Sequence, residues 1–177
     1  AGTYLTVGTD NTAAMNAAHA TGLPVYYPAG TYLFKTLSTT TFVSGGIIGD
    51  GMGSTFLVSI DNTTADLITF YGSNADSAGI PVSNYHSPVF AKFSLQGALG
   101  GAASLGLFPS GTIPSTAVLS KSAGAGINIA PRTTEMTNVD FAQVRIVNVP
   151  VGLRLTAAAF WKVHECAFEN WMIAGLL

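Results

Sequence analysis

Short apolar runs recur along most of the chain, and polar turns separate them. Val25, Ile48, Phe70 and Phe93 each lie inside such a run and recur at intervals of about 23 residues. A short apolar run bounded by turn residues is typical of a buried β-strand. Recurrence at about 20 to 30 residues is typical of a repeat architecture, because each repeat must bury its apolar face on its neighbours.

The second half of the chain carries two further repeating tracks. Residues 126–129, 152–155 and 175–176 form the first track, at intervals of about 25 residues. Residues 139–141 and 166–168 form the second track, at an interval of about 27 residues. Two tracks that repeat together favour two faces of one coiled β-structure. An ordinary β-sandwich with regularly spaced strands is the alternative.

Residues 10–34 predict a helix followed by the first strands. Asp10 is a good N-cap, because its carboxylate can accept hydrogen bonds from the free amides of the first helical turn. Strong helix formers dominate residues 12–20, and Gly22 ends the predicted helix. A β-prone Val-Tyr-Tyr run between two prolines comes next, and a Pro-Ala-Gly-Thr turn completes the stretch.

Two motifs in this stretch are more specific than a helix and a turn. The first is Asp-Asn-Thr-Ala-Ala-Met-Asn-Ala-Ala, from Asp10, and the second is Val-Tyr-Tyr-Pro-Ala-Gly-Thr-Tyr, from Val25. Together they resemble the N-terminal module of the pectate-lyase-like right-handed β-helix superfamily, which is common in bacteriophage tailspikes. That module usually has Gly-Asp-Gly before the helix, whereas residues 5–9 read Leu-Thr-Val-Gly-Thr here. The resemblance implies that the helix closes one end of the β-helix and that the second motif forms the first coil.

The expected fold is therefore all-β, a right-handed parallel β-helix with a short N-terminal capping α-helix. We expect one segment of a β-helix domain over residues 1–177, with the lead-in and capping helix at 1–22 and the coils at 23–177. Polar stretches rich in Gly, Ser and Pro predict loops that project from the coils near 72–88 and 97–126. Because the chain begins without Met and ends on an apolar run, we expect a piece of a longer protein.

Composition narrows the possible partners. Charged residues make up 9% of the chain, against about 25% in an average soluble domain, and the mean hydropathy is +0.42. The net charge of −2 provides no broad basic surface, so we expect no nucleic acid partner. No apolar run approaches the roughly 18 residues of a membrane helix, so we expect no membrane insertion. Cys166 is the single cysteine, which excludes an intrachain disulfide.

The resemblance also implies a function at the bacterial surface. It implies a segment of a phage tailspike or tail-fibre protein, located in the virion, that recognises a bacterial surface polysaccharide and depolymerises it in the intact protein. Such proteins are usually homotrimers, and the low charge agrees with buried lateral contacts. Two alternatives stay open: a non-catalytic structural or adhesive β-helix segment, and part of a secreted, extracellular enzyme similar to pectate lyases or polygalacturonases.

Candidate catalytic residues come from the thin supply of carboxylates. Polysaccharide hydrolysis needs two carboxylates about 5 to 10 Å apart, and a lyase needs a base beside a uronate together with cationic help. The candidates are Asp140, Glu165 and Glu169, and the interval of the second track places Asn138 beside Glu165 and Ala142 beside Glu169. The alternatives are that these are solvated charges on an outward face and that the active site lies outside this chain.

Candidate ligand contacts are cations and aromatic side chains, because sugar rings stack on aromatic rings. The candidate substrate-binding residues are Arg132, Arg145, Arg154, His164, Tyr71 and Tyr85. Phe90 and Trp161 are expected to fill the interior, and His19 is expected to lie on the surface. His164 and Cys166 are the one close pair of metal-ligating types, fewer than the three or four ligands of a zinc site, so we expect no metal and no cofactor.

Overall fold

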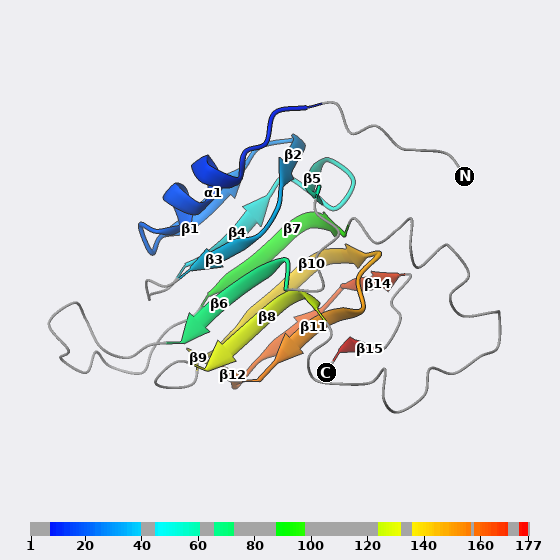
Figure 1. Ribbon diagram of the computed structural model, residues 1–177. Helices are drawn as coiled ribbons and strands as arrows, with labels where there is room; N and C mark the ends of the chain where they lie inside the picture. The colour runs from blue at the N-terminus through cyan, green and yellow to red at the C-terminus, as the bar shows by residue number, and fades with distance from the viewer. Residues whose placement is uncertain are drawn as a thin grey trace, which may run out of the picture.

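The computed structural model describes residues 8–39, 45–60, 66–72, 88–97, 124–131, 136–156, 158–169 and 174–176. Within these ranges the chain is all-β apart from one short helix, and every strand pairing is parallel. Figure 1 shows the two main sheets with the helix at the N-terminal end. The two expected loops fall largely on 73–87 and 98–123, outside the described residues.

The strands follow one another in a fixed order of sheets. The chain runs along the larger sheet, sheet A, then along the smaller sheet, sheet B, and returns to sheet A, and we call each such traverse a passage. The five passages comprise β1 (Pro24–Tyr27), β2 (Gly30–Phe34) and β3 (Leu37–Thr39); β4 (Gly46–Gly49), β5 (Thr55–Ser59) and β6 (Ile68–Gly72); β7 (Val89–Gln96), β8 (Ala125–Pro131) and β9 (Met136–Thr137); β10 (Asp140–Val147), β11 (Val151–Leu155) and β12 (Ala158–Ala159); and β13 (Lys162–His164), β14 (Ala167–Glu169) and β15 (Ala174–Leu176).

Each strand pairs with its counterpart in the next passage. Sheet A has eight strands, with β1, β4, β7, β10 and β13 in order and with β2, β5 and β14 paired alongside. Sheet B has the order β3, β6, β8, β11 and β15, and β9 pairs with β12 in a separate two-stranded sheet. β7 pairs directly with β10, so these two strands are neighbours in sheet A.

The observed register corrects two of the expected repeats. Val25 lies opposite Ile47 instead of Ile48, and Phe70 belongs to sheet B, so the repeat expected from Val25 to Phe93 mixes two sheets. Phe168 lies opposite Ile146 instead of Phe141, so the match between residues 139–141 and 166–168 is wrong.

The remaining track is confirmed. Leu153 lies opposite Ile127 and opposite Leu176 in sheet B, as the first track places them.

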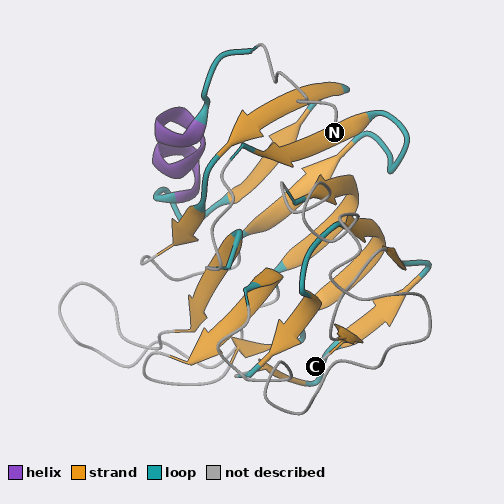
Figure 2. Ribbon diagram, turned by 45° about the vertical axis from the view of Figure 1, so that its right-hand side comes forward, coloured by secondary structure: helices purple, strands orange, loops and turns teal. Residues whose placement is uncertain are grey.

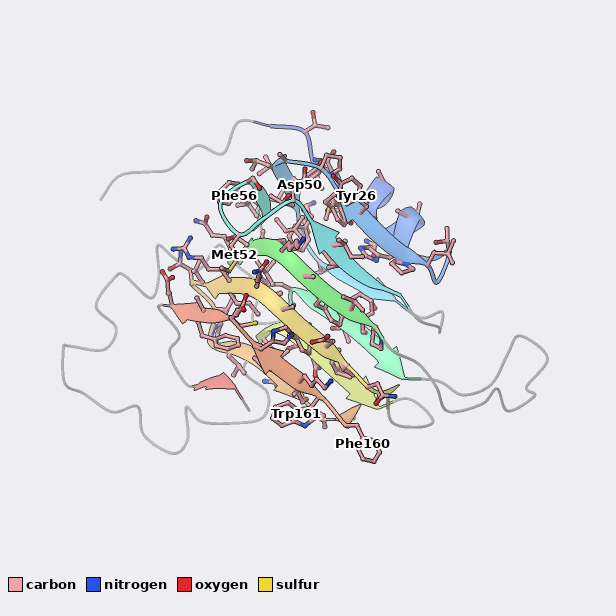
Figure 3. The ribbon with its side chains drawn as sticks, turned by 180° about the vertical axis from the view of Figure 1, so that it is seen from behind. Tyr26, Asp50, Met52, Phe56, Phe160 and Trp161 are labelled. Atoms are coloured by element: carbon pink, nitrogen blue, oxygen red, sulfur yellow. The ribbon has the colours of Figure 1, made fainter. Side chains whose placement is uncertain are left out.

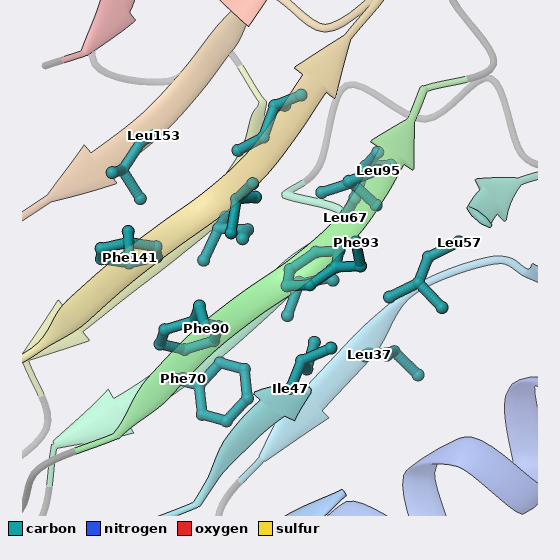
Figure 4. Close-up of a cluster of buried hydrophobic side chains, with 14 of the residues drawn as sticks. Leu37, Ile47, Leu57, Leu67, Phe70, Phe90, Phe93, Leu95, Phe141 and Leu153 are labelled. Carbon is teal, nitrogen blue, oxygen red and sulfur yellow. The ribbon is translucent and has the colours of Figure 1, made fainter. Parts of the chain in front are cut away.

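The core lies between the two sheets and runs through all the passages. Sheet A contributes a column of inward side chains in which the rings of Phe90 and Phe141 stack at 4.6 Å. Phe70 from sheet B meets Phe90 edge-on at 4.8 Å (Figure 4). Both sheet A residues are at most 1% exposed, so the expected interior position of Phe90 is confirmed. This continuous apolar column explains the high hydropathy of the chain.

The helix α1 (Thr12–His19) lies over the first passage, at the end of the sheets remote from the C-terminus (Figure 2). Its N-cap residue is Asn11, so the expected N-cap position of Asp10 is wrong by one residue. The Asp10 carboxylate still accepts from the Thr12 amide of the first turn, at 2.9 Å. The buried face consists of Met15 and His19, so the expectation of a surface His19 is wrong. A helix this short depends on that packing for its stability.

Candidate functional site

Sharp corners in sheet A decide which side chains face outward. The inward residues of β7 are Phe90, Phe93 and Leu95, so one residue more than strict alternation separates the first two. That additional residue, Lys92, has a φ of 60°. Gln143 and Glu165, at the same place in the next two passages, have φ values of 56° and 55°. The three side chains therefore stand in one column along a bend of the sheet.

The bend brings polar side chains of β10, β13 and β14 together on the outer face of sheet A. We call Asp140, Gln143, Arg145, His164, Glu165 and Glu169 the polar row. The Asp140 carboxylate lies 3.1 Å from His164 Nε2, and the Gln143 amide donates to Glu165 at 2.7 Å. Arg145 donates two hydrogen bonds to Glu169, at 2.8 and 2.7 Å.

The electrostatics of the Arg145–Glu169 pair favour the ionised form of both side chains. The hydrogen bonds from Arg145 hold the pKa of the Glu169 carboxyl below its ordinary value, and Glu169 raises the pKa of the Arg145 guanidinium. The side chains of this pair are 39% and 45% exposed, so water competes for both groups. A polar ligand can reach them without opening the core.

A second polar cluster lies in sheet B and is much less exposed. Asp66, just before β6, accepts from the Ala125 amide at 2.7 Å and from the Asn128 side chain at 2.6 Å. Arg154 in β11 donates to the same carboxylate at 3.1 Å. The Arg154 and Asp66 side chains are 11% and 19% exposed. Arg154 is thus held by a largely buried carboxylate, far less open to a ligand than Arg145.

The structure gathers five of the sequence-predicted site residues in the polar row: Asp140, Arg145, His164, Glu165 and Glu169. Tyr71 lies in β6, where it is opposite Ala130 of β8. Arg132 and Tyr85 lie outside the described residues. The polar row is therefore the place where the predicted candidates converge.

Asp10 and Asp50 serve local structure. Thr12 donates to Asp10 and holds the pKa of that carboxyl below its ordinary value. The Tyr26 hydroxyl and the Ala29 amide donate to Asp50, which lowers its pKa in the same way. Asp50 thereby fastens the turn between β1 and β2 to the second passage.

Sequence reasoning missed Lys92 and Gln143 of the bend and the exposed aromatic residues Phe160 and Trp161. Trp161 is 44% exposed, so its expected interior position is wrong, and Phe160 is 81% exposed. Figure 3 shows both at the end of sheet A remote from Tyr26 and Asp50. The sequence did contain a signal for the bend, because the same unequal spacing of apolar residues, first three positions and then two, occurs in three successive passages. The three sets are Phe90, Phe93 and Leu95; Phe141, Val144 and Ile146; and Val163, Cys166 and Phe168.

Within the described ranges, no three or more His, Cys, Asp or Glu side chains gather as they would around a metal ion. The same ranges contain no helix with the length and apolar character needed to cross a bilayer. No family model, curated protein or solved structure matched the chain.

Proposed function

We propose that this chain is a segment of a right-handed parallel β-helix of the tailspike or tail-fibre type and that its polar row recognises a bacterial surface polysaccharide. The all-parallel pairing, the fixed order of sheets and the helix over the first passage support the β-helix. The proposal includes a homotrimer in a phage virion that depolymerises the polysaccharide when intact. The alternatives are a structural segment and a secreted enzyme.

One observation carries the recognition part of this proposal. The register of β10 with the strands β13 and β14 places five predicted site residues on one exposed face. They supply one cationic donor, Arg145, together with carboxylate acceptors and an imidazole, and Gln143 adds an amide that can donate and accept. Sugars present hydroxyl groups that both donate and accept, so this mixture suits a carbohydrate.

The lowered pKa of Glu169 supports a role for this residue in recognition more than in cleavage. A glycoside hydrolase needs one carboxylic acid that stays protonated near neutral pH. Arg145 lowers the pKa of Glu169, which keeps that carboxylate ionised. Glu169 is therefore suited to accept hydrogen bonds from hydroxyl groups and poorly suited to protonate a leaving group.

Binding and cleavage are tested together with purified capsular and O-antigen polysaccharides. Titration calorimetry measures binding, absorbance of unsaturated uronate detects a lyase, and new reducing ends without that absorbance detect a hydrolase. Binding without cleavage supports recognition and assigns catalysis elsewhere. Failure of the chain to bind any polysaccharide of the panel overturns the proposal.

A pair of exposed cations provides the matched variants. Arg145→Ala removes a guanidinium that donates two hydrogen bonds to Glu169 within the polar row. The variant should bind the polysaccharide about tenfold more weakly, because a charge-assisted hydrogen bond contributes more than a neutral one. Lys35→Ala removes a cation that pairs with Asp10 at the other end of the sheet and should leave the affinity unchanged. If both variants bind the polysaccharide with equal affinity, the polar row is not part of the binding site.

A further inference from the structure

Six residues other than glycine have a positive φ within the described part of the chain. Two are asparagines, which tolerate this conformation, and they lie at corners of the fourth passage: Asn138 and Asn148. The other four have side chains that disfavour it: Lys92, Gln143, Phe160 and Glu165. Their φ values lie between 54° and 60°. The chain thus places unfavourable residues at corners where asparagine or glycine would serve.

One of these corners shows that a less strained residue fits. Phe160 stands one passage after Asn138, given the register of Asp140 with Lys162, and both residues have a positive φ. The fold therefore accepts Asn in this column, and the backbone conformation gives no reason for Phe there.

Burial does not explain Lys92, Glu165 or Phe160 either. Lys92 and Glu165 are exposed, and Phe160 is 81% exposed, whereas Gln143 is half-buried and donates to Glu165. The corner position itself exposes Phe160. Asn138 occupies the same corner one passage earlier, and it is exposed even though a further passage stacks next to it. Phe160 combines a disfavoured φ with apolar surface in water, and backbone strain of this kind concentrates at functional sites.

We propose that Lys92, Gln143, Glu165 and Phe160 contact the polysaccharide directly and are kept for binding at the expense of stability. The inference rests on the proposed function and extends its site from the polar row to the bend column and the Phe160 corner. Lys92, Gln143 and Glu165 offer a donor, an amide and an acceptor for hydroxyl groups. Phe160 offers a ring face for the C–H face of a sugar.

The charges assign the class of polysaccharide. In the described part of this face, the cations are Lys92, Arg145 and Lys162, and the carboxylates are Asp50, Asp140, Glu165 and Glu169. A face without an excess of positive charge gives no long-range attraction for a polyanion. The ligand is therefore a neutral polysaccharide, and its affinity should change little with salt.

A second copy of this chain is a poorer occupant. Phe160 and the neighbouring Trp161 are the large apolar side chains exposed at this end of the described structure. Two aromatic side chains bury at most about 250 Å² each, whereas a stable protein interface needs about 800 Å² from each partner. A sugar ring needs only a small aromatic surface beside polar groups.

The test separates stability from binding in the 177-residue chain. Lys92→Gly, Glu165→Gly and Phe160→Asn replace a strained residue by one that tolerates positive φ, and each should raise Tm by about 2 °C. Each should weaken binding of the neutral polysaccharide about tenfold by calorimetry. Asn148→Gly, at a corner outside the proposed site, should leave the affinity unchanged.

Four results would overturn the inference. If the wild-type chain binds a polysaccharide and the three variants bind it equally well, these residues are not contacts and the proposed function stands. A fall in Tm for all three variants shows that the corners do not disfavour the native residues. Preferential binding of a uronate-containing polysaccharide contradicts the neutral class, and a wild-type chain that binds none removes both proposals.

Discussion

The two sheets each hold an arginine–carboxylate pair, and the pairs differ chiefly in burial. Arg154 and Asp66 in sheet B are 11% and 19% exposed, whereas Arg145 and Glu169 in sheet A are 39% and 45% exposed. The exposed pair has the shorter contact, 2.7 against 3.1 Å. A short distance does not by itself make a pair important for stability, because water can replace an exposed partner and cannot reach a buried one.

This difference divides the polar residues by role. The buried cluster joins the second, third and fourth passages through Asp66, Asn128 and Arg154, so it fixes the stacking of sheet B. The exposed row leaves its groups within reach of solvent and of a ligand. Stability measurements and binding measurements should therefore respond to different substitutions.

The largest effect is expected at the buried cluster. Asp66→Ala removes the acceptor of the Ala125 amide, the Asn128 amide and the Arg154 guanidinium, and should lower the free energy of unfolding by about 4 kcal/mol. Urea denaturation measures the change. Affinity of the folded variant for polysaccharide should stay at the wild-type value, and a loss below about 1 kcal/mol would show that burial does not set the importance of this pair.

The next effect concerns His19, a buried polar side chain without a charged partner in the described contacts. Its Nε2 lies 2.9 Å from the Tyr27 hydroxyl, and its ring also meets Phe70 edge-on. Burial lowers the pKa of His19 from 6.5 to about 4. Burial also raises the pKa of Tyr27, so that hydroxyl stays protonated.

The lowered pKa of His19 predicts acid sensitivity. Between pH 6.5 and 4, His19 is protonated in the unfolded chain and neutral in the folded chain. The free energy of unfolding therefore falls as the pH decreases through this window. The total loss is about 3 kcal/mol, complete below pH 4. Urea denaturation from pH 7 to 4 measures it, and His19→Gln should remove this part of the pH dependence. An identical slope in the variant would assign the acid sensitivity to other groups.

The smallest effect is expected at the exposed pair. A double-mutant cycle with Arg145→Ala and Glu169→Ala should give a coupling that shifts Tm by less than about 2 °C, because solvent screens the pair. The coupling should shrink further in high salt. A coupling as large as the Asp66→Ala effect would erase the distinction between the two sheets.

Local features of the fold could be predicted from the sequence. The helix begins and ends within a residue or two of the expected bounds, because Asp10 and Gly22 act on the backbone beside them. The strand after the helix is also where the sequence places it, but the predicted Pro-Ala-Gly-Thr turn is shorter than expected, because β2 begins at Gly30. The parallel pairing of residues 127, 153 and 176 followed from their simple spacing.

The membership of the candidate site was predictable only in part. Five residues of the polar row were chosen for their chemistry, but their partners were assigned with the wrong register. The error arose because residues 139–141 and 166–168 share an apolar-x-Phe pattern, whereas Phe168 in fact lies opposite Ile146. Two similar patterns within one long strand cannot be told apart without knowing how many residues each corner uses.

The sequence by itself determined what depends on neighbours along the chain: the short helix, the turn residues, the β-prone runs and the balance of few charges with many apolar residues. The tertiary structure decided the register of β10 with β13 and β14, the burial of His19 and Asp66, and the exposure of Phe160. The physical reason is that strand pairing and burial are set by contacts between passages. A single left-handed residue such as Gln143 adds one position at a corner and thereby changes which side chains meet.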